Sequence, residues 1–433
     1  MFTVIYKHTN RNLDTDITLS QYEYTLQTIT DYDQWLDFYD PNFQKVKFNN
    51  SLQEPANKND TLIFPVDFQS TKLNSVVYSI EKLCGDAMAY KNKKKVILLY
   101  TSTEPFFFKQ EDSKLTDLVK KFPNLTFILS GSGHSAKSSQ AEILLQQPNV
   151  HFITKLWYFD RVHYNTQIRD SFTDRHMKLS EETAPKGTPD YVTCPNKFLL
   201  TMRNPRSHRM LMSALIENSN VLEATRYSRN WSLKANHITG LHDNSETKHE
   251  AIYQTHLILD SIDELAQELP ESLLSKIIKT ALGHTHILDM PNISDRGHPG
   301  KWLYDNINIA VIAGGEGSGY GYADEKQMIP MYYKIPFITF GCKGIYEEME
   351  RIGFKSYRSC WDLSWTKADT MFERVNGCYM LLDYLQNLKL DDMVKVLEKA
   401  QPDVNYNYSH LTSGRFRIAS NNQFFTEIEN ACS

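Results

Sequence analysis

The sequence predicts an α/β fold made of two domains, each with a parallel β-sheet covered by helices. Apolar runs rich in Val, Ile, Leu and Phe alternate with segments of helical spacing, which is the pattern of βαβ units. A length of 433 residues exceeds what one ordinary core accommodates. A polar stretch with three prolines interrupts the alternation. We therefore expect a first domain over residues 1–175, a linker over 176–195, and a second domain with a helical insertion over 196–433.

The first domain follows this alternation segment by segment. Continuous apolar runs indicate buried strands, and apolar residues three and four apart indicate amphipathic helices. The expected strands are "MFTVIY", "TLIFPVDF", "KKKVILLY", "NLTFILSGSGH" and "NVHFITKLWYF". The expected helices are "LNSVVYSIEKLCGDAMAY", "KLTDLVKKF" and "SSQAEILLQQ". Residues 1–60 are polar after the first strand, and we expect loops and short helices there.

The second domain repeats the pattern after the linker. The expected strands are "KFLLTMRN", "NINIAVIA" and "KIPFITFG". The first helix is expected over "PRSHRMLMSALIENS", with Pro205 in its first turn, where proline is tolerated. A helix pair is expected over "SIDELAQELPESLLSKIIKTAL", broken near Pro270, and further helices over "GIYEEMERIGF", "MFERVNGCYMLLDYLQNL" and "KLDDMVKVLEKA".

Composition and charge exclude several classes of protein. Hydrophobic residues make up 41% and charged residues 23%, which is ordinary for a globular protein. A net charge of -5 gives no global attraction to nucleic acid or to an anionic membrane. The chain start has no signal-peptide pattern, and no segment approaches the ~20 apolar residues of a membrane span. The six cysteines are scattered, which suits a reducing compartment and argues against a zinc site. We expect a cytoplasmic protein without membrane contact and without an essential metal.

Ligands of open parallel sheets bind outside the carboxyl ends of the strands. The polar segments that follow expected strands are therefore the candidate site residues. They are Asp67, Glu104, Ser130–His134, Arg203–Arg209 and Gly314–Lys326.

The segment "TMRNPRSHRM" gathers Arg203, Arg206, His208 and Arg209 where a strand passes into a helix. A helix start offers free N–H groups and a partial positive charge. Guanidinium groups add bidentate contacts to phosphate oxygens. The segment therefore indicates a diphosphate site. The alternative is a solvated basic first turn.

The segment "AGGEGSGYGYADEK" places Gly314, Gly315 and Glu316 after one strand, and Glu325 and Lys326 at the next helix start. Glycines let the backbone approach a ligand closely, and a carboxylate suits ribose hydroxyls. Lys326 would then lie near a phosphate. No P-loop pattern is present. The alternative is a flexible loop followed by a charged helix cap.

Two carboxylates in the first domain are candidates for proton transfer. Glu104 follows a buried strand and precedes Pro105 and three phenylalanines, a setting that raises a carboxyl pKa. Asp67, in "FPVDFQS", is a weaker case of the same kind. A helix-capping role for Glu104 is an equal alternative. His134 in its Gly/Ser loop would ordinarily be just an exposed side chain.

Three features of the chain occur in a fixed order: "MRNPRSHRM" after a strand, Glu316, and "DEKQMIPMYYKIPFITFGCKGIYEEMERIGF". They resemble the order "NRxPRxHR", an acidic residue, "(T/S)EK", a proline and "PFxxxGxxGxxxxLxxxGF", with Asp324 in place of the hydroxyl residue. That order is carried by a family of glycosyltransferases of phages, giant viruses and marine bacteria, which the chain therefore resembles. The match covers roughly residues 196–215 and 305–375.

The resemblance implies a GT-B-like fold, in which two Rossmann-like domains face each other across a cleft. It implies an acceptor-side first domain and a second domain that binds a nucleotide-sugar donor, expected to be UDP-linked. Glu104 or Asp67 would serve as the base of an inverting reaction. If the protein is viral, its compartment is the host cytoplasm.

The acceptor stays open at this point. Related phages glycosylate hydroxymethylcytosine in their DNA, so double-stranded DNA is one candidate, beside glycan and protein. A local groove would have to bind it, and the first domain offers lysines 91, 93, 94, 95, 109, 137 and 155. The alternative for "KNKKK" is a solvated lead-in to a strand. A non-catalytic nucleotide-sugar-binding protein and a nucleotide-sugar epimerase are the competing functions.

Overall fold

The computed structural model divides the chain into two compact units, formed by Met1–Tyr164 with Gly414–Ser433 and by Asn165–Ser413. Each unit is described by itself. The residues described are 2–5, 46–49, 61–67, 73–90, 93–100, 113–131, 143–154, 196–202, 204–229, 231–233, 245–286, 304, 307–314, 325–413 and 415–433.

The first unit contains a six-stranded sheet in the order β2-β1-β3-β4-β5-β6, and every neighbouring pair is parallel. The strands are β1 Phe2–Ile5, β2 Val46–Asn49, β3 Thr61–Asp67, β4 Lys95–Tyr100, β5 Thr126–Gly131 and β6 Val150–Thr154. Five of these strands were predicted, and β2 was not, because its four residues are only half apolar.

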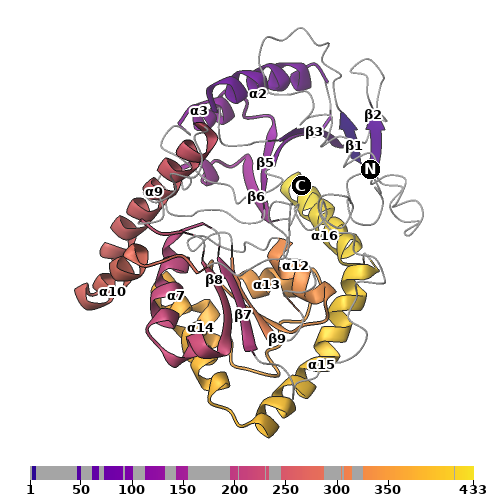
Figure 1. The fold of residues 1–433 in the computed structure, drawn as a ribbon. Coiled ribbons are helices and arrows are strands. Elements are labelled where there is room, and N and C mark those ends of the chain that lie inside the picture. Colours follow the sequence, from indigo (N-terminus) through magenta and orange to yellow (C-terminus); the bar gives the residue numbers. More distant parts are fainter. Residues whose placement is uncertain are drawn as a thin grey trace. The chain divides into compact units, whose positions relative to one another are not determined.

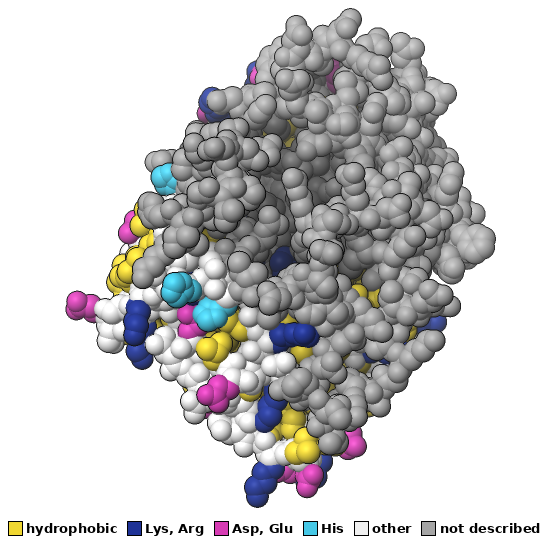
Figure 2. Space-filling view, in the orientation of Figure 1, with side chains coloured by type: hydrophobic (Ala, Val, Ile, Leu, Met, Phe, Trp, Pro, Cys, Tyr) yellow, Lys and Arg dark blue, Asp and Glu magenta, His cyan; other side chains and the backbone are white. Residues whose placement is uncertain are grey.

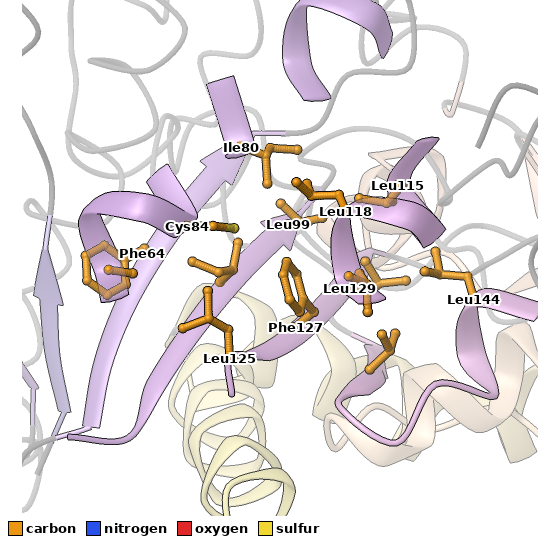
Figure 3. Packing of buried hydrophobic residues seen from close by; sticks show 14 of the residues in the cluster. Phe64, Ile80, Cys84, Leu99, Leu115, Leu118, Leu125, Phe127, Leu129 and Leu144 are labelled. Atoms are coloured by element: carbon orange, nitrogen blue, oxygen red, sulfur yellow. The ribbon is translucent and has the colours of Figure 1, made fainter. Parts of the chain in front are cut away.

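Alternate residues of the first sheet point into two separate apolar clusters. Leu62 and Phe64 of β3 pack with the helices α2 (Leu73–Met88) and α3 (Ser113–Lys121). Figure 3 shows this cluster, in which Phe127 is fully buried. Ile63, between them, packs on the opposite side with the helix α16 (Arg415–Ala431). The period of two in a strand produces this division, and it shows that both faces of the sheet are covered.

The last helix, α16, belongs to the first unit although the sequence analysis placed residues 196–433 in the second domain. Phe424 and Ile428 are four residues apart and share one helix face, which packs on Ile63 and Val96 of the sheet. Figure 1 shows α16 beside strands β5 and β6. Burial of this face explains why the end of the chain groups with the first sheet.

The second unit contains a four-stranded parallel sheet in the order β10-β9-β7-β8. The strands are β7 Asn196–Met202, β8 Thr225–Arg229, β9 Ile307–Ala313 and β10 Phe337–Phe340. β8 was not predicted, since "TRYSR" reads as polar although three of its last four side chains are buried. All seven side chains of β9 are buried, as its continuous apolar run predicts.

Helices cover both faces of the second sheet, with α7 and α14 on one side and α12 and α15 on the other (Figure 1). The helices are α7 Ser207–Glu217, α9 Ser245–Ala266, α10 Glu271–Leu282, α12 Glu325–Tyr332, α13 Ile345–Arg351, α14 Met371–Gln386 and α15 Leu390–Thr412, with 3-10 turns at Asn220–Ala224 and Ser364–Lys367. The predicted α/β class with two Rossmann-like, parallel-sheet domains is thereby confirmed.

Several helix boundaries differ from the expectation. α9 begins at Ser245, well before the expected start at Ser261. α7 begins at Ser207 with Arg206 as its N-cap, so Pro205 precedes the helix instead of lying in its first turn. α15 continues to Thr412 through Pro402, well past the expected end at Ala400. The predicted helix over 138–147 is helical in its described part only at residues 143–145. None of the described helices combines the length and the hydropathy needed to cross a bilayer.

Candidate functional site

The order in which strands are added to the second sheet reverses between β7 and β9. After β7 the chain adds β8 on one side, and it adds β9 and then β10 on the other side. Such a reversal leaves a crevice outside the carboxyl ends of the two central strands. β7 ends at Met202 and β9 at Ala313, so the segments 203–209 and 314–326 both begin at this switch point. We take the switch point as the candidate ligand site.

The helix α7 starts at this switch point without a side-chain cap. Its N-cap residue is Arg206, in extended backbone conformation, and no side chain accepts from the first turn at the cap position. Arginine has no acceptor atom, so it cannot fill the role that Ser, Thr, Asp or Asn usually fill. Arg206 itself is half-buried. An anion would therefore meet both the N–H groups of the first turn and a guanidinium.

The turn that leads into α7 is held in place by α9. The hydroxyl of Ser261 donates to the carbonyl of Pro205 at 2.9 Å, and the amide of Gln254 donates to Asn204 Oδ1 at 3.3 Å. The hydroxyl of Ser207, the first helical residue, donates to the carboxylate of Glu264. Glu264 thus supplies a nearby negative charge beside the basic turn, and α9 fixes the position of Arg206.

His208 and Arg209 both bind the carbonyl oxygen of Gly314. Nε2 of His208 lies 2.9 Å from this oxygen, and Nη2 of Arg209 donates to it at 2.8 Å. Arg209 Nη1 also donates to the carbonyl of Asn204 at 3.3 Å. The His208 side chain is fully buried, and Arg209 is only 5% exposed. These contacts join the start of α7 to the end of β9.

The electrostatics of this junction keep His208 neutral. Burial lowers the pKa of the imidazole well below its ordinary value, and the positive charge of Arg209 lowers it further. The charges of Arg206 and Arg374 act in the same direction, while the bond to Gly314 opposes them. A carbonyl oxygen can only accept, so Nε2 carries the proton in the neutral ring.

Arg374 on α14 adds a third guanidinium that the sequence analysis missed. Its Nε donates to the carbonyl of Gly341, just after β10, at 2.8 Å. Its Nη1 donates to the carbonyls of Ala368 and Asp369 at 2.8 and 2.9 Å. The side chain is 3% exposed, and burial lowers its pKa. An arginine on the buried face of an expected amphipathic helix was the available signal, because that face also carries Met371 and Val375.

The start of α12 is supported by a buried polar network. The amide of Gln327 donates to the hydroxyl of Thr339 on β10 at 3.0 Å, and that hydroxyl donates to the carbonyl of Ile312 at 3.3 Å. The Tyr346 hydroxyl accepts from the backbone N–H of Thr339 at 2.8 Å. α12 begins at Glu325, as predicted, and Lys326 is half-buried. The network fixes the first turn that carries both residues.

The first sheet has its own switch point, at β1. From β1 the chain adds β2 on one side and β3 on the other. The carboxyl ends of β1 and β3 therefore mark the place in this sheet where a ligand crevice is expected. Asp67 is the last residue of β3 and stands in register with Tyr100, the last residue of β4. Glu104 follows Tyr100 by four positions and lies outside the described residues, as do Arg203, Gly315, Glu316 and the side chain of Glu325.

The lysines considered for a DNA groove are placed only in part. Lys93, Lys94 and Lys95 lie at the amino end of β4, whereas Asp67 lies at the carboxyl end of the neighbouring strand β3. Lys91, Lys109, Lys137 and Lys155 lie outside the described residues. On the face shown in Figure 2, the basic and acidic side chains of the described residues are scattered singly. This placement favours the interpretation of Lys93–Lys95 as a solvated lead-in to β4 over their interpretation as part of a DNA-binding groove.

No set of three or more His, Cys, Asp or Glu side chains suited to a metal ion occurs among the described residues. The polar groups gathered at the switch point of the second sheet are three guanidiniums, one neutral imidazole, backbone atoms and the carboxylate of Glu264, which accepts from Ser207. The positive charges outnumber this one carboxylate, so the set favours an anion.

No protein-family model and no curated protein matches the chain. Among solved structures it is similar to the OtsA apo structure, at 9% identity over 97% of this chain and 98% of that chain, with a TM-score of 0.36. It is similar to an α,α-trehalose 6-phosphate synthase from Burkholderia multivorans, at 7% identity over 87% and 73%, with a TM-score of 0.35. It is also similar to the DNA modifying enzyme β-glucosyltransferase, at 10% identity over 97% and 100%, with a TM-score of 0.37.

Proposed function

We propose that the protein is a glycosyltransferase that transfers a sugar from a nucleoside-diphosphate donor to an acceptor hydroxyl. One observation carries the proposal: an uncapped helix start with Arg206 at its N-cap lies at the switch point of a parallel sheet. Two further guanidiniums, of Arg209 and Arg374, lie close enough to lower the pKa of His208 between them. A donor diphosphate is the ligand class that this charge distribution favours.

The same groups would assist the chemical step. When the bond between the sugar and the diphosphate breaks, its electron pair leaves with the diphosphate oxygen. Guanidiniums and helix N–H groups that are already in place stabilise that developing negative charge without reorganisation. In the proposal Arg206 and Lys326 lie near the phosphates, and Glu325 and Glu316 bind the ribose. No metal ion is required for this charge balance, and the donor is UDP-linked.

We propose that a carboxylate of the first unit is the general base. Glu104 or Asp67 takes the proton of the acceptor hydroxyl, and the hydroxyl oxygen forms the new bond to the anomeric carbon. Asp67 stands at the carboxyl end of β3, beside the switch point of its sheet. Polar groups at that edge are the ones a ligand can reach, which supports the assignment.

Donor binding tests the proposal directly. Isothermal titration calorimetry with UDP-, GDP- and TDP-sugars should identify one tightly bound class for the parent protein. Arg206→Ala should weaken its binding about 10-fold or more, because a hydrogen bond to a charged group contributes roughly 1.5–3 kcal/mol. Arg226→Ala is the matched control, since Arg226 is half-exposed on β8, three residues before that strand ends.

Equal affinity in Arg206→Ala and the parent would remove the phosphate role of Arg206. Products then separate the competing functions. Transfer to an acceptor, or slow donor hydrolysis, supports a glycosyltransferase, and conversion of the free donor to its epimer supports an epimerase. Binding without any turnover indicates a nucleotide-sugar-binding protein.

The acceptor proposed is a hydroxymethylated pyrimidine in double-stranded DNA. The proposal rests on the family resemblance, and the placement of Lys93–Lys95 does not add to it. Assays on hydroxymethylcytosine DNA, on unmodified DNA and on an oligosaccharide panel decide the matter. If DNA is the acceptor, its affinity should fall with salt by a log–log slope near -0.9 for each phosphate neutralised. Salt-insensitive transfer to a glycan would rule DNA out.

A further inference from the structure

We infer that His208 and Arg209 act together as positioning residues that hold Gly314, at the end of β9, in place before the sugar donor binds, and do not bind that donor themselves. The inference rests on the proposed function and assigns a division of labour within its site. Of the arginines described in this turn, Arg206 is then the one assigned to the phosphates.

The inference rests on two hydrogen bonds that one carbonyl oxygen accepts. The Gly314 oxygen accepts from His208 at 2.9 Å and from Arg209 at 2.8 Å, and so both of its lone pairs are used. A charge-assisted hydrogen bond of this length is among the stronger ones in proteins. Gly314 is also held from the other side, because its N–H donates to the carbonyl of Phe340 on β10 at 2.9 Å.

The hydrogen bond of the His208 side chain in the described structure is the one to this oxygen. Its ring is fully buried and lies edge-on to Phe340, with 6.0 Å between the ring centroids. Nδ1, the other ring nitrogen, has no hydrogen-bond partner in the described structure. A buried nitrogen without a partner is costly. The contact with Gly314 is therefore what the imidazole contributes here.

The two terminal nitrogens of Arg209 are also used within the protein. It is 5% exposed and donates to the carbonyls of Gly314 and Asn204, one at the end of β9 and one in the turn before α7. It thereby joins the two segments that border the switch point. Holding these segments before the donor arrives removes an ordering cost from donor binding.

Substituting His208 by glutamine and by methionine isolates the hydrogen bond. The two side chains are nearly isosteric, but only glutamine can donate to Gly314. We expect His208→Gln to keep donor affinity within about 3-fold of the parent and His208→Met to weaken it about 10-fold, the loss of roughly one hydrogen bond. Arg209→Met should resemble His208→Met. Affinities are measured by calorimetry with UDP and with the best donor.

Hydrogen exchange of the donor-free proteins gives an independent measure. The peptide Ile307–Gly314 contains the Gly314 amide, which donates to Phe340. Its exchange should accelerate in His208→Met and stay near the parent rate in His208→Gln, while the β8 peptide Thr225–Arg229 is unchanged in both. Equal exchange in the two variants overturns the inference. So does a loss of donor affinity in both variants, since that indicates direct donor contact by the imidazole.

The two proposals fail in distinguishable ways. If the parent binds no nucleotide, the proposed function fails, and with it the donor-related part of the inference, whereas the exchange measurement still decides whether His208 holds Gly314. If the parent binds donor and His208→Met binds it equally well, the positioning role fails while the proposed function stands.

Discussion

The two parallel sheets of this protein are stabilised in different ways. In the first unit the described core is apolar on both faces of the sheet, as Figure 3 shows for one of them. In the second unit the interior also contains charged side chains. Every buried Arg, Glu and His among the described residues belongs to that unit. Burying such groups is costly unless they are hydrogen-bonded, so the difference indicates where the protein concentrates its polar chemistry.

The buried arginines of the second unit share one arrangement. Arg209 holds the carbonyl that follows β9, and Arg374 holds the carbonyl of Gly341 that follows β10. Arg229, the last residue of β8, donates to the carbonyls of Trp231 and His284 at 2.6 and 2.7 Å. Arg229 also has a carboxylate partner, Glu217, at 2.7 Å. Because Arg209 also donates to the carbonyl of Asn204, two residues after β7, guanidiniums bind the backbone at all four carboxyl strand ends of this sheet.

The largest expected effect tests whether the first unit supplies the chemistry and the second the donor site. We expect Glu104→Gln to lower the transfer rate about 100-fold to 10,000-fold, because that range is typical of a lost general base. Donor affinity should stay within a few-fold of the parent, since the substitution leaves the second unit unchanged. Turnover is measured with saturating donor, and affinity by calorimetry.

Asp67→Asn is the companion substitution. If Glu104 caps a helix, its variant melts at a lower temperature and keeps its turnover per folded molecule, and Asp67→Asn should then show the rate loss. Normal turnover in both variants would contradict the assignment of a base to the first unit, and would favour a retaining mechanism.

A smaller effect is expected from the apolar core of the first unit. Phe127→Ala should destabilise that unit by about 3–5 kcal/mol, because it leaves a cavity among fully buried side chains. Met88→Ala, at a side chain 38% exposed on α2, should cost far less. Urea unfolding followed by hydrogen exchange of β5 and β9 peptides reports each unit separately. A larger loss in β9 than in β5 would contradict the separate cores.

The sequence was sufficient to predict most of the fold but only part of the site. Continuous apolar runs predicted β3, β4, β7 and β9, because strands buried on both faces carry such runs. β8 was not predicted, since its buried residues include the polar Ser228 and Arg229. The place of the helix α16 in the first core was not predicted, because Phe424 joins the cluster that contains Ile63 only through tertiary packing.

The site was predictable where residues follow a strand directly and unpredictable where they come from elsewhere. Arg206, His208 and Arg209 follow β7 and could be found from their spacing alone. Arg374 lies more than 160 positions further along the chain, and only packing of α14 brings it to the same edge. The spacing of the "TMRNPRSHRM" segment also could not reveal that His208 and Arg209 are buried and bonded to Gly314.

The smallest expected effect concerns how the stability of the second unit depends on pH. The pKa of His208 lies well below its ordinary value of 6.5 in the folded chain, chiefly because the ring is buried. Above pH 6.5 both folded and unfolded chains keep it neutral, and its contribution to stability is constant. Below pH 6.5 the unfolded chain takes up a proton that the folded chain does not. The second unit should therefore lose up to about 1.4 kcal/mol of stability per pH unit through this residue.

His208→Gln removes the titrating group while it keeps a donor for Gly314. The free energy of unfolding of the second unit, from urea titrations monitored by hydrogen exchange of the β9 peptide, should fall more steeply for the parent than for this variant between pH 6.5 and pH 5. The first unit, monitored through β5, should give the same curve in both proteins, because His208 lies outside it. Parallel curves for the second unit would mean that His208 takes up its proton as readily in the folded chain as in the unfolded chain, which would contradict the lowered pKa of the buried ring. A steeper parent curve would tie the pH response of this unit to the same imidazole that holds the end of β9.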